Sequence, residues 1–132
     1  MVGACFAVVT SAPRMRLMTE HLLDRYGFRS QCCGVRTTPI HVLDLCNNPD
    51  KVIDDVVHAS VCARDEDKAE VIVLGCAGMS PYQAVIERRV RLPVIDGTVA
   101  AIKLCEAMVD MGLKTSKFLT FDYPVHENDL HG

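Results

Sequence analysis

The sequence lacks several features that would place it in a large class of proteins. No apolar run approaches the roughly 18 residues that a helix needs to cross a bilayer, and Met1 to Ala4 lack the basic stretch of a secretory signal. Basic residues are not in excess, because 14 Lys and Arg stand against 17 Asp and Glu for a net charge of -3. These absences predict a cytoplasmic protein that binds neither nucleic acid nor membrane.

The chain also lacks the cysteine pattern of a disulfide framework or a zinc site. Its seven cysteines are an odd number, Cys32 and Cys33 are adjacent, and there is no C-x-x-C pair. We therefore expect free thiols in a reducing compartment. His58 and Cys62, one helical turn apart, are the only local pair with ligand spacing, and a lone pair is weak evidence, so we predict no metal.

What remains is the composition of an ordinary globular domain. The 132 residues are 49% hydrophobic and 23% charged, with no biased tract and no internal repeat. A chain of this size buries roughly 68% of its unfolded surface and has no room for a second full domain. One hydrophobic core is expected.

Hydrophobic patterning alternates between strands and helices along the chain. Buried strands are predicted at 4–9, 32–38, 71–74 and 93–95, and the 40–43 stretch is compatible with either a strand or a packed loop. Amphipathic helices are predicted at 13–26, from 49 into the charged residues 65–70, from 80 onward, and at 98–111. This order predicts an α/β fold with a parallel four-stranded sheet and helices on both faces.

The ends of these helices carry recognisable signals. Asn48 is an N-cap followed by proline at the first helical position, and Ser80-Pro81-Tyr82-Gln83 combines a capping box with proline. Gly27 and Gly112 are typical helix terminators. In the first helix, apolar residues recur at three- and four-residue steps and predict its buried face: Met15, Met18, Leu22 and Tyr26.

Ligands of such sheets bind at the carboxyl edge of the strands, which directs attention to Cys76. Cys76 stands between a buried strand and a predicted helix, where unpaired N–H groups and a helix dipole favour a thiolate. Gly75 and Gly78 leave room for a ligand to approach the backbone. Because free cysteine is also a common buried residue, context alone leaves a packing role open for Cys76. The other six cysteines have settings more typical of packing.

Other cysteine chemistries do not fit this loop. A phosphatase-type C-x5-R loop requires arginine where Tyr82 stands, and thioredoxin-like chemistry requires cysteine where Met79 stands. The phosphoacceptor site of a receiver domain requires acidic residues at the end of the first strand, where Thr10 and Ser11 stand.

Several segments, in order, resemble one known family. They are 6–10 (FAVVT), the stretch 26–45, 71–79 (VIVLGCAGM), 93–97 (PVIDG) and 112–117 (GLKTSK). Together they are similar to the hydantoin racemase branch of the aspartate/glutamate racemase superfamily, and the resemblance covers the chain to about Lys117. It implies a flavodoxin-like lobe, with residues 1–117 matching the second of the family's two lobes and 118–132 forming a C-terminal tail.

The resemblance also implies a chemistry. Family members move a proton at the carbon beside a carbonyl without a cofactor, using two cysteines on opposite faces of a small substrate such as a hydantoin or an acidic amino acid. Cys76 matches the second-lobe cysteine. The residues that match the substrate pocket are Thr10, Ser11, Gly75, Ala77, Gly78, Asp96 and Gly97, with the amides around Gly75, Ala77 and Gly78 expected to hold an oxyanion.

The first lobe and its cysteine have no counterpart in this chain, which leaves its activity open. One alternative is decarboxylation of a malonate-like acid, which needs a single cysteine; another is a non-catalytic, small-molecule-binding remnant. The predicted helix at 98–111 is apolar over more than one face. We expect a homo-oligomer formed through this helix, for example by exchange of the helix between copies. The helix is also compatible with packing as the fourth crossover helix of a compact sheet.

Overall fold

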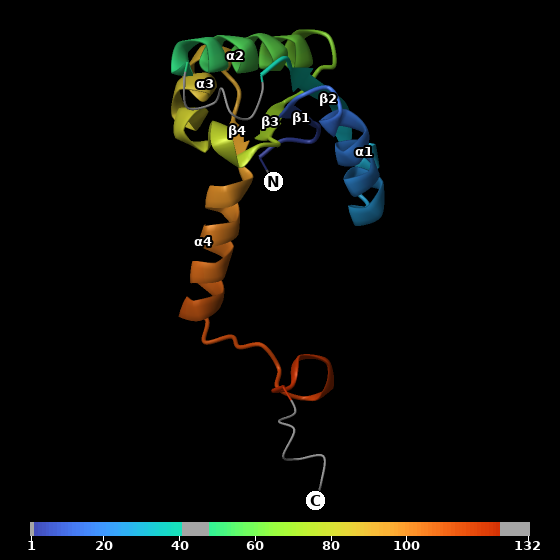
Figure 1. Cartoon of the computed structure of the whole chain (residues 1–132), viewed down its shortest axis with the longest axis vertical. Helices are drawn as coiled ribbons and strands as arrows, with labels where there is room; N and C mark the ends of the chain where they lie inside the picture. Colours follow the sequence, from blue (N-terminus) through green and yellow to red (C-terminus); the bar gives the residue numbers. More distant parts are fainter. Residues whose placement is uncertain (1, 41–47, 125–132) are drawn as a thin grey trace, which may run out of the picture. The chain divides into compact units, whose positions relative to one another are not determined.

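A four-stranded parallel sheet organises the chain (Figure 1). A computed structural model describes residues 2–40 and 48–124; most of the 40–43 stretch, Cys46 and the tail after 124 lie outside the described residues. The strands are β1 (Phe6–Ser11), β2 (Cys32–Thr38), β3 (Val71–Leu74) and β4 (Val94–Asp96). They pair in the order β2-β1-β3-β4, all parallel. The predicted α/β class and parallel sheet are confirmed.

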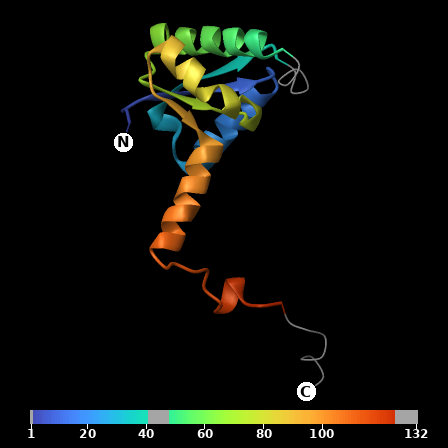
Figure 2. The same ribbon diagram turned by 90° about the vertical axis from the view of Figure 1, so that its left-hand side faces the viewer.

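Helices cover both faces of this sheet, as predicted. The helices α2 (Pro49–Asp65) and α3 (Gln83–Val90) lie side by side on one face, and α1 (Met15–Tyr26) lies on the other (Figures 1 and 2). Because side chains alternate along a strand, the α2–α3 face buries Ala7, Val9, Ile72 and Leu74, and the α1 face carries Val8 and Val35 beneath Leu23.

Several helix ends follow the signals in the sequence. Asn48 Oδ1 accepts a hydrogen bond of 3.3 Å from the Lys51 N–H, and Pro49 occupies the first position of α2. Gly27 ends α1 in the left-handed conformation with φ 74°, which a residue with a side chain adopts only at a cost.

Three local predictions were wrong. β1 includes Thr10 and Ser11, because they pair with Thr37 and Thr38 of β2. The predicted stripe of α1 is not buried: Met18, Leu22 and Tyr26 are exposed and Leu23 alone among the helix residues is buried, since α1 lies over β1 and β2 only. Ser80 does not start an α-helix; a 3-10 segment, Ala77–Tyr82, runs through Pro81 and α3 begins only at Gln83.

The chain divides into two compact units, Met1–Ala100 and Ala101–Gly132. The sheet and α1 to α3 belong to the first unit. Most of α4 (Gly97–Asp110) belongs to the second, and every residue of this helix is exposed. None of the helices in the described part of the chain has the length and apolar character of a membrane span.

An ion pair holds β2 to the segment that precedes β3. Arg36 donates from Nε to Asp67 Oδ2 and from Nη2 to Asp67 Oδ1, both at 2.7 Å, and the two side chains are 30% and 20% exposed. Gly34 makes room for this carboxylate, because a Cβ there would lie 2.5 Å from Asp67 Oδ2. The hydrogen bonds from Arg36 lower the pKa of Asp67 below its ordinary value.

The Asp67→Asn variant is expected to lower the free energy of unfolding by about 1–2 kcal/mol at pH 7, because it removes a charge-assisted, two-point contact. Because the pKa of Asp67 is lowered by folding, its stabilisation is complete above the ordinary aspartate value of about 3.9 and is lost as the pH falls through the lower, folded value. Urea unfolding at pH 7 and below pH 4 measures both effects.

Asp65→Asn is the matched control for this variant. Asp65 pairs with Arg64 at the surface and its side chain is 57% exposed, so its loss should cost much less. Equal losses from the two variants, or a loss from Asp67→Asn that does not change with pH, would contradict this assignment.

Candidate active site

The carboxyl ends of the strands bring the predicted site residues to one edge of the sheet. Ser11 of β1 pairs with Thr38 of β2, and Leu74 of β3 pairs with Val9 on one side and Asp96 of β4 on the other. The strands therefore end at nearly the same level, and the loop that begins with Gly75 leaves the sheet between β1 and β4 (Figure 1).

Gly75 and Thr10 fix the start of this loop. The Gly75 N–H donates to Val9 O at 2.8 Å, and Thr10 Oγ1 donates to Gly75 O at 3.2 Å. A Cβ on Gly75 would lie 2.8 Å from Thr10 Cβ and 3.0 Å from Val8 Cγ1, so a side chain at this position would push the loop away from β1. The Gly75 N–H is thus bonded within the sheet, and Gly75 contributes through its missing side chain.

Thr10 and Ser11 are both buried, at 1% and 3% exposure. Thr10 is held between neighbouring strands: its hydroxyl bonds to Gly75, and its carbonyl accepts a hydrogen bond of 3.5 Å from Thr38 Oγ1. Thr10 therefore positions the cysteine loop, and Ser11 lies one residue nearer the edge.

Cys76 lies at the turn from β3 into the 3-10 segment. Its backbone is extended, with φ -142° and ψ 123°, and its side chain is partly buried. The Met79 N–H donates to Cys76 O at 3.0 Å, and the Met79 side chain is fully buried in the core, which anchors the loop from below.

The N–H groups of Ala77 and Gly78 begin the 3-10 segment and have no hydrogen-bond partner among the described residues. Both residues are exposed. Because α3 begins only at Gln83, the donors that directly follow Cys76 are these two N–H groups of a 3-10 segment and not the first turn of an α-helix. They are suited to hold a carbonyl or carboxylate oxygen.

Asp96 is a buried carboxylate with one oxygen unused. Its Oδ1 accepts a hydrogen bond of 2.8 Å from the Thr98 N–H, and the side chain is 8% exposed. Two opposing effects act on the pKa of Asp96. Burial alone would raise this pKa, but the combined effect of the Ser80 hydroxyl and the backbone N–H groups of Thr98 and Val99 is larger, so the pKa lies below its ordinary value. Neither Asp96 Oδ2 nor Ser80 Oγ has a well-formed hydrogen bond among the described residues. A ligand N–H at this edge would satisfy the carboxylate.

Gly97 follows Asp96, is exposed and opens α4; a Cβ there would meet no atom within 4 Å, so nothing in the described residues requires glycine at this position. Asp96 also lines a hollow of about 260 Å³ with Gln83, Val94, Ile95, Val99 and Ala100. The proximity of Ser80 to Asp96 was missed at the sequence level because the residues lie on different elements and no motif links them.

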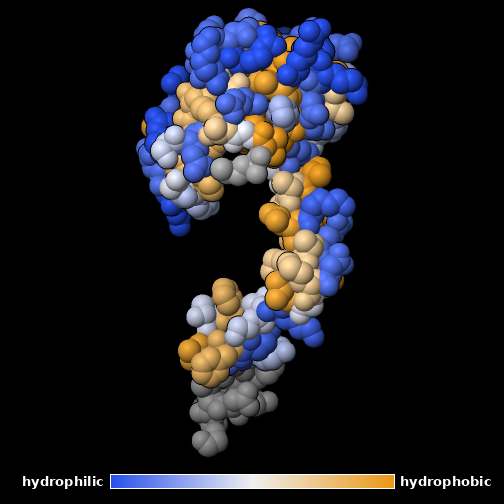
Figure 3. Space-filling model, turned by 180° about the vertical axis from the view of Figure 1, so that it is seen from behind, coloured by the Kyte–Doolittle hydropathy of each residue, from blue (hydrophilic) through white to orange (hydrophobic). Residues whose placement is uncertain are grey.

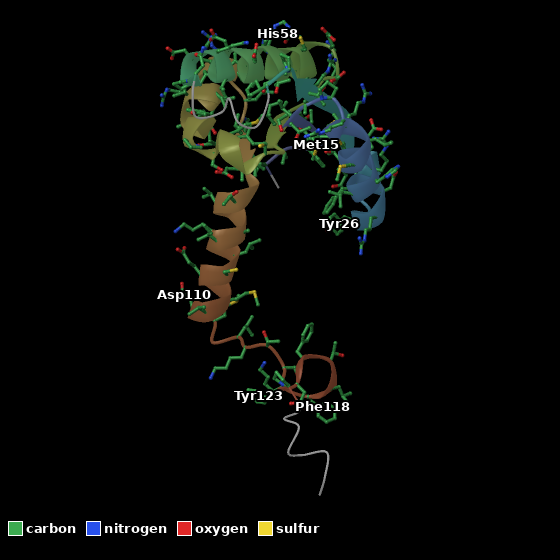
Figure 4. The ribbon with its side chains drawn as sticks, in the orientation of Figure 1. Met15, Tyr26, His58, Asp110, Phe118 and Tyr123 are labelled. Carbon is green, nitrogen blue, oxygen red and sulfur yellow. The ribbon has the colours of Figure 1, made fainter. Side chains whose placement is uncertain are left out.

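The other described cysteines of the first unit, Met1–Ala100, lie away from this edge. Burial raises the pKa of Cys32, and burial together with the neighbouring Cys5 raises the pKa of Cys33 to about 12. These three lie at the amino ends of β1 and β2. Cys62 lies on α2 with its sulfur 3.9 Å from His58 Nε2, and His58 points outward (Figure 4). No group of three or more potential metal ligands occurs within residues 2–40 and 48–124.

Comparison with known proteins gives a consistent set of relatives. The family model described as Asp/Glu/Hydantoin racemase matches residues 1–105. A hydantoin racemase from Pseudomonas sp. (strain NS671) is 44% identical over 94% of this chain and 50% of its own length. A hydantoin racemase from Rhizobium meliloti is 40% identical over 90% of this chain and 49% of its own length.

Solved structures agree with these relatives. An allantoin racemase from Klebsiella pneumoniae has a TM-score of 0.87 and 36% identity, over 96% of this chain and 52% of that one. An allantoin racemase from Pseudomonas fluorescens has a TM-score of 0.84 and 36% identity, over 96% of this chain and 54% of that one. The chain spans about half the length of the relatives it matches. With the family model, the relatives and the fold in agreement, the chain belongs to the Asp/Glu/hydantoin racemase family.

Proposed function

We propose that Cys76 is an acid/base residue that moves a proton at the α-carbon of a hydantoin or an acidic amino acid, without a cofactor. The observation that carries the proposal is the setting of Cys76: a partly buried thiol at the carboxyl end of β3, followed by two N–H groups that have no partner among the described residues. The names of the hydantoin and allantoin racemase relatives support this substrate class.

Each neighbour has a role in this reaction. The Cys76 thiolate removes the α-proton, and the electron pair left on carbon is delocalised onto the adjacent carbonyl oxygen. The N–H groups of Ala77 and Gly78 stabilise the charge that develops there. Asp96 accepts a hydrogen bond from a substrate N–H through its unused oxygen. Thr10 and Gly75 hold the loop in place, and Ser11 and Gly97 complete the edge.

Racemisation also requires a proton donor on the opposite face of the substrate. Family resemblance implies a second cysteine for this role, and among the described cysteines of the first unit only Cys76 lies at the carboxyl edge. We propose that the chain acts as the second lobe of the racemase architecture and associates with itself through α4, so that a second copy completes the pocket. The exposed apolar residues of α4 support this association.

A second candidate reaction uses one thiol only. In decarboxylation of a malonate-like acid, the bond between the α-carbon and the carboxylate breaks, carbon dioxide leaves, and the electron pair remains as an enolate. The Cys76 thiol then protonates this enolate from one face. This reaction suits an isolated chain, because it needs no more than the Cys76 thiol and the N–H groups of Ala77 and Gly78. A protein that only binds a small molecule would retain the Asp96 contact and perform neither reaction.

Hydrogen exchange tests the proposed proton transfer. In deuterated water at neutral pH, the protein should exchange the α-hydrogen of 5-substituted hydantoins above the uncatalysed background. Cys76→Ala should reduce that exchange by about 100-fold or more, the usual contribution of a general base. Cys62→Ala is the control, since Cys62 lies on α2, and should keep the full rate. Exchange that survives in Cys76→Ala would overturn the role of this thiol.

Alkylation tests whether the thiol is activated. Cys76 should react with iodoacetamide faster at neutral pH than the other cysteines, including the exposed Cys105, because the N–H groups of Ala77 and Gly78 beside it favour negative charge. Cys32 and Cys33 should be slow, since their pKa values are raised. Peptide mass spectrometry gives the rate at each site. A rate at Cys76 equal to or below that at Cys105 would count against an activated thiolate.

A further inference from the structure

Within the described residues of the first unit, no helix lies over one half of the α1 face of the sheet. The hollow there has a volume of about 390 Å³ and is lined by the outward side chains of β1, β3 and β4, the N-terminal segment and the end of α1: Val2, Gly3, Ala4, Phe6, Val8, Leu23, Phe28, Gln31, Val71, Val73 and Ile95. Gln31 is the single polar residue in this lining and none is charged. Phe28, at the rim, is 49% exposed. An apolar surface of this kind indicates that another element covers it.

The open area has the width of one helix. α1 lies over β2 and β1, while β3 and β4 have helices on their other face only. Strands lie about 4.8 Å apart, and a helix with its side chains is about 10 Å wide, so one helix covers two strands. Among the described helices of the first unit, none therefore covers the β3–β4 half of the α1 face.

α4 is rich in apolar residues, and all of its residues are exposed. Leu104 is 67% exposed, Met108 49% and Val109 74%. Lys103, Glu106 and Asp110 fall on one side of the helix, with Lys103 Nζ 2.6 Å from Glu106 Oε2. Helical spacing places Leu104 and Met108 on the opposite side. Figure 3 shows apolar side chains along this helix, with the hydrophilic ones gathered on one side.

The connection between β4 and α4 is shorter than the connections that follow β1 and β3. A helix that packs on the sheet runs antiparallel to its strand, and the turn that reverses the chain commonly takes about two to six residues. β4 ends at Asp96 and α4 begins at Gly97, so no residue is left for a turn. By contrast, residues 12–14 separate β1 from α1, and residues 75–82 separate β3 from α3.

We propose that the β3–β4 hollow of one chain receives α4 of a second copy, and that the second copy's hollow receives α4 in return. The hollow and the apolar side of α4 belong to the same chain. In a two-fold exchange, α4 of each copy is therefore buried in the hollow of the other copy. A connection too short to reverse the chain is a known route to such exchange. This inference deepens the proposed self-association by naming the receiving surface, and it does not depend on the chemistry of Cys76.

Two variants of the full chain test the two sides of the contact. Leu104→Glu places a charge on the apolar side of α4, and Phe28→Glu places one at the rim of the hollow. Light scattering over a range of concentrations should show a dimer for the unaltered protein, and each variant should raise the dissociation constant by about tenfold or more. Both positions are exposed, and circular dichroism confirms that the variants fold.

Matched controls add the same charge elsewhere. Lys103→Gln makes α4 more negative by one charge on its polar side, and His58→Glu places one on the outer surface of α2; both should leave the dimer unchanged. Mixing Leu104→Glu with Phe28→Glu should restore a weaker dimer, because one of the two helix–hollow contacts is then free of both substitutions.

Three results would overturn the proposal. The first is an unaltered protein that is monomeric, which would mean that the chain's own α4 or a different polypeptide covers the hollow. The second is a dimer that Phe28→Glu does not weaken, and the third is a mixture of the two variants that stays monomeric. Hydrogen exchange on hydantoins, measured on the same samples, separates this outcome from the proposed reaction: loss of exchange with an intact exchange dimer contradicts the reaction alone.

Discussion

The close approach of β1 and β3 at Gly75 is the constraint on which the site depends. Gly75 continues the sheet by donating its N–H to Val9 O, and its carbonyl accepts a hydrogen bond from the Thr10 hydroxyl. The two strands lie too close at this point for a Cβ on Gly75. Cys76 follows directly, and buried Met79 ties the other end of the loop to the core. The thiol and the two free amides are thus presented by rigid elements, as a preorganised site requires.

A second constraint acts on the sheet as a whole. Its α2–α3 face is closed by a continuous core, while the buried cluster on the opposite face is small. That cluster consists of Leu23, Val8 and Val35, with Phe6, Cys32 and Val73 partly buried against it. The first unit therefore retains an apolar hollow on the α1 face of its sheet. The chain also carries α4, a helix rich in apolar residues with none of them buried. The same arrangement links assembly to chemistry, since one thiol at one edge can serve one face of a planar carbanion, and a two-base reaction needs a group from elsewhere.

Much of the fold was predictable because it rests on local signals. The strand at Val71–Leu74 is apolar on consecutive residues, and Asn48-Pro49 and Gly27 mark helix ends by their own chemistry. The failures depend on contacts between elements. Met18, Leu22 and Tyr26 have helical spacing but nothing to pack against, and Ser80 has the residues of a capping box inside a 3-10 segment. The edge position of Cys76 followed from strand order, whereas the unused oxygen of Asp96 depends on tertiary geometry.

The most direct test of a pocket completed by two copies is the rate of α-hydrogen exchange per chain as a function of protein concentration. If a second copy completes the site, the rate per chain rises with concentration in step with the fraction of dimer and levels off when the dimer is fully formed. A rate per chain that is constant from fully monomeric to fully dimeric protein would mean that Cys76 works within a single lobe, and would contradict the account.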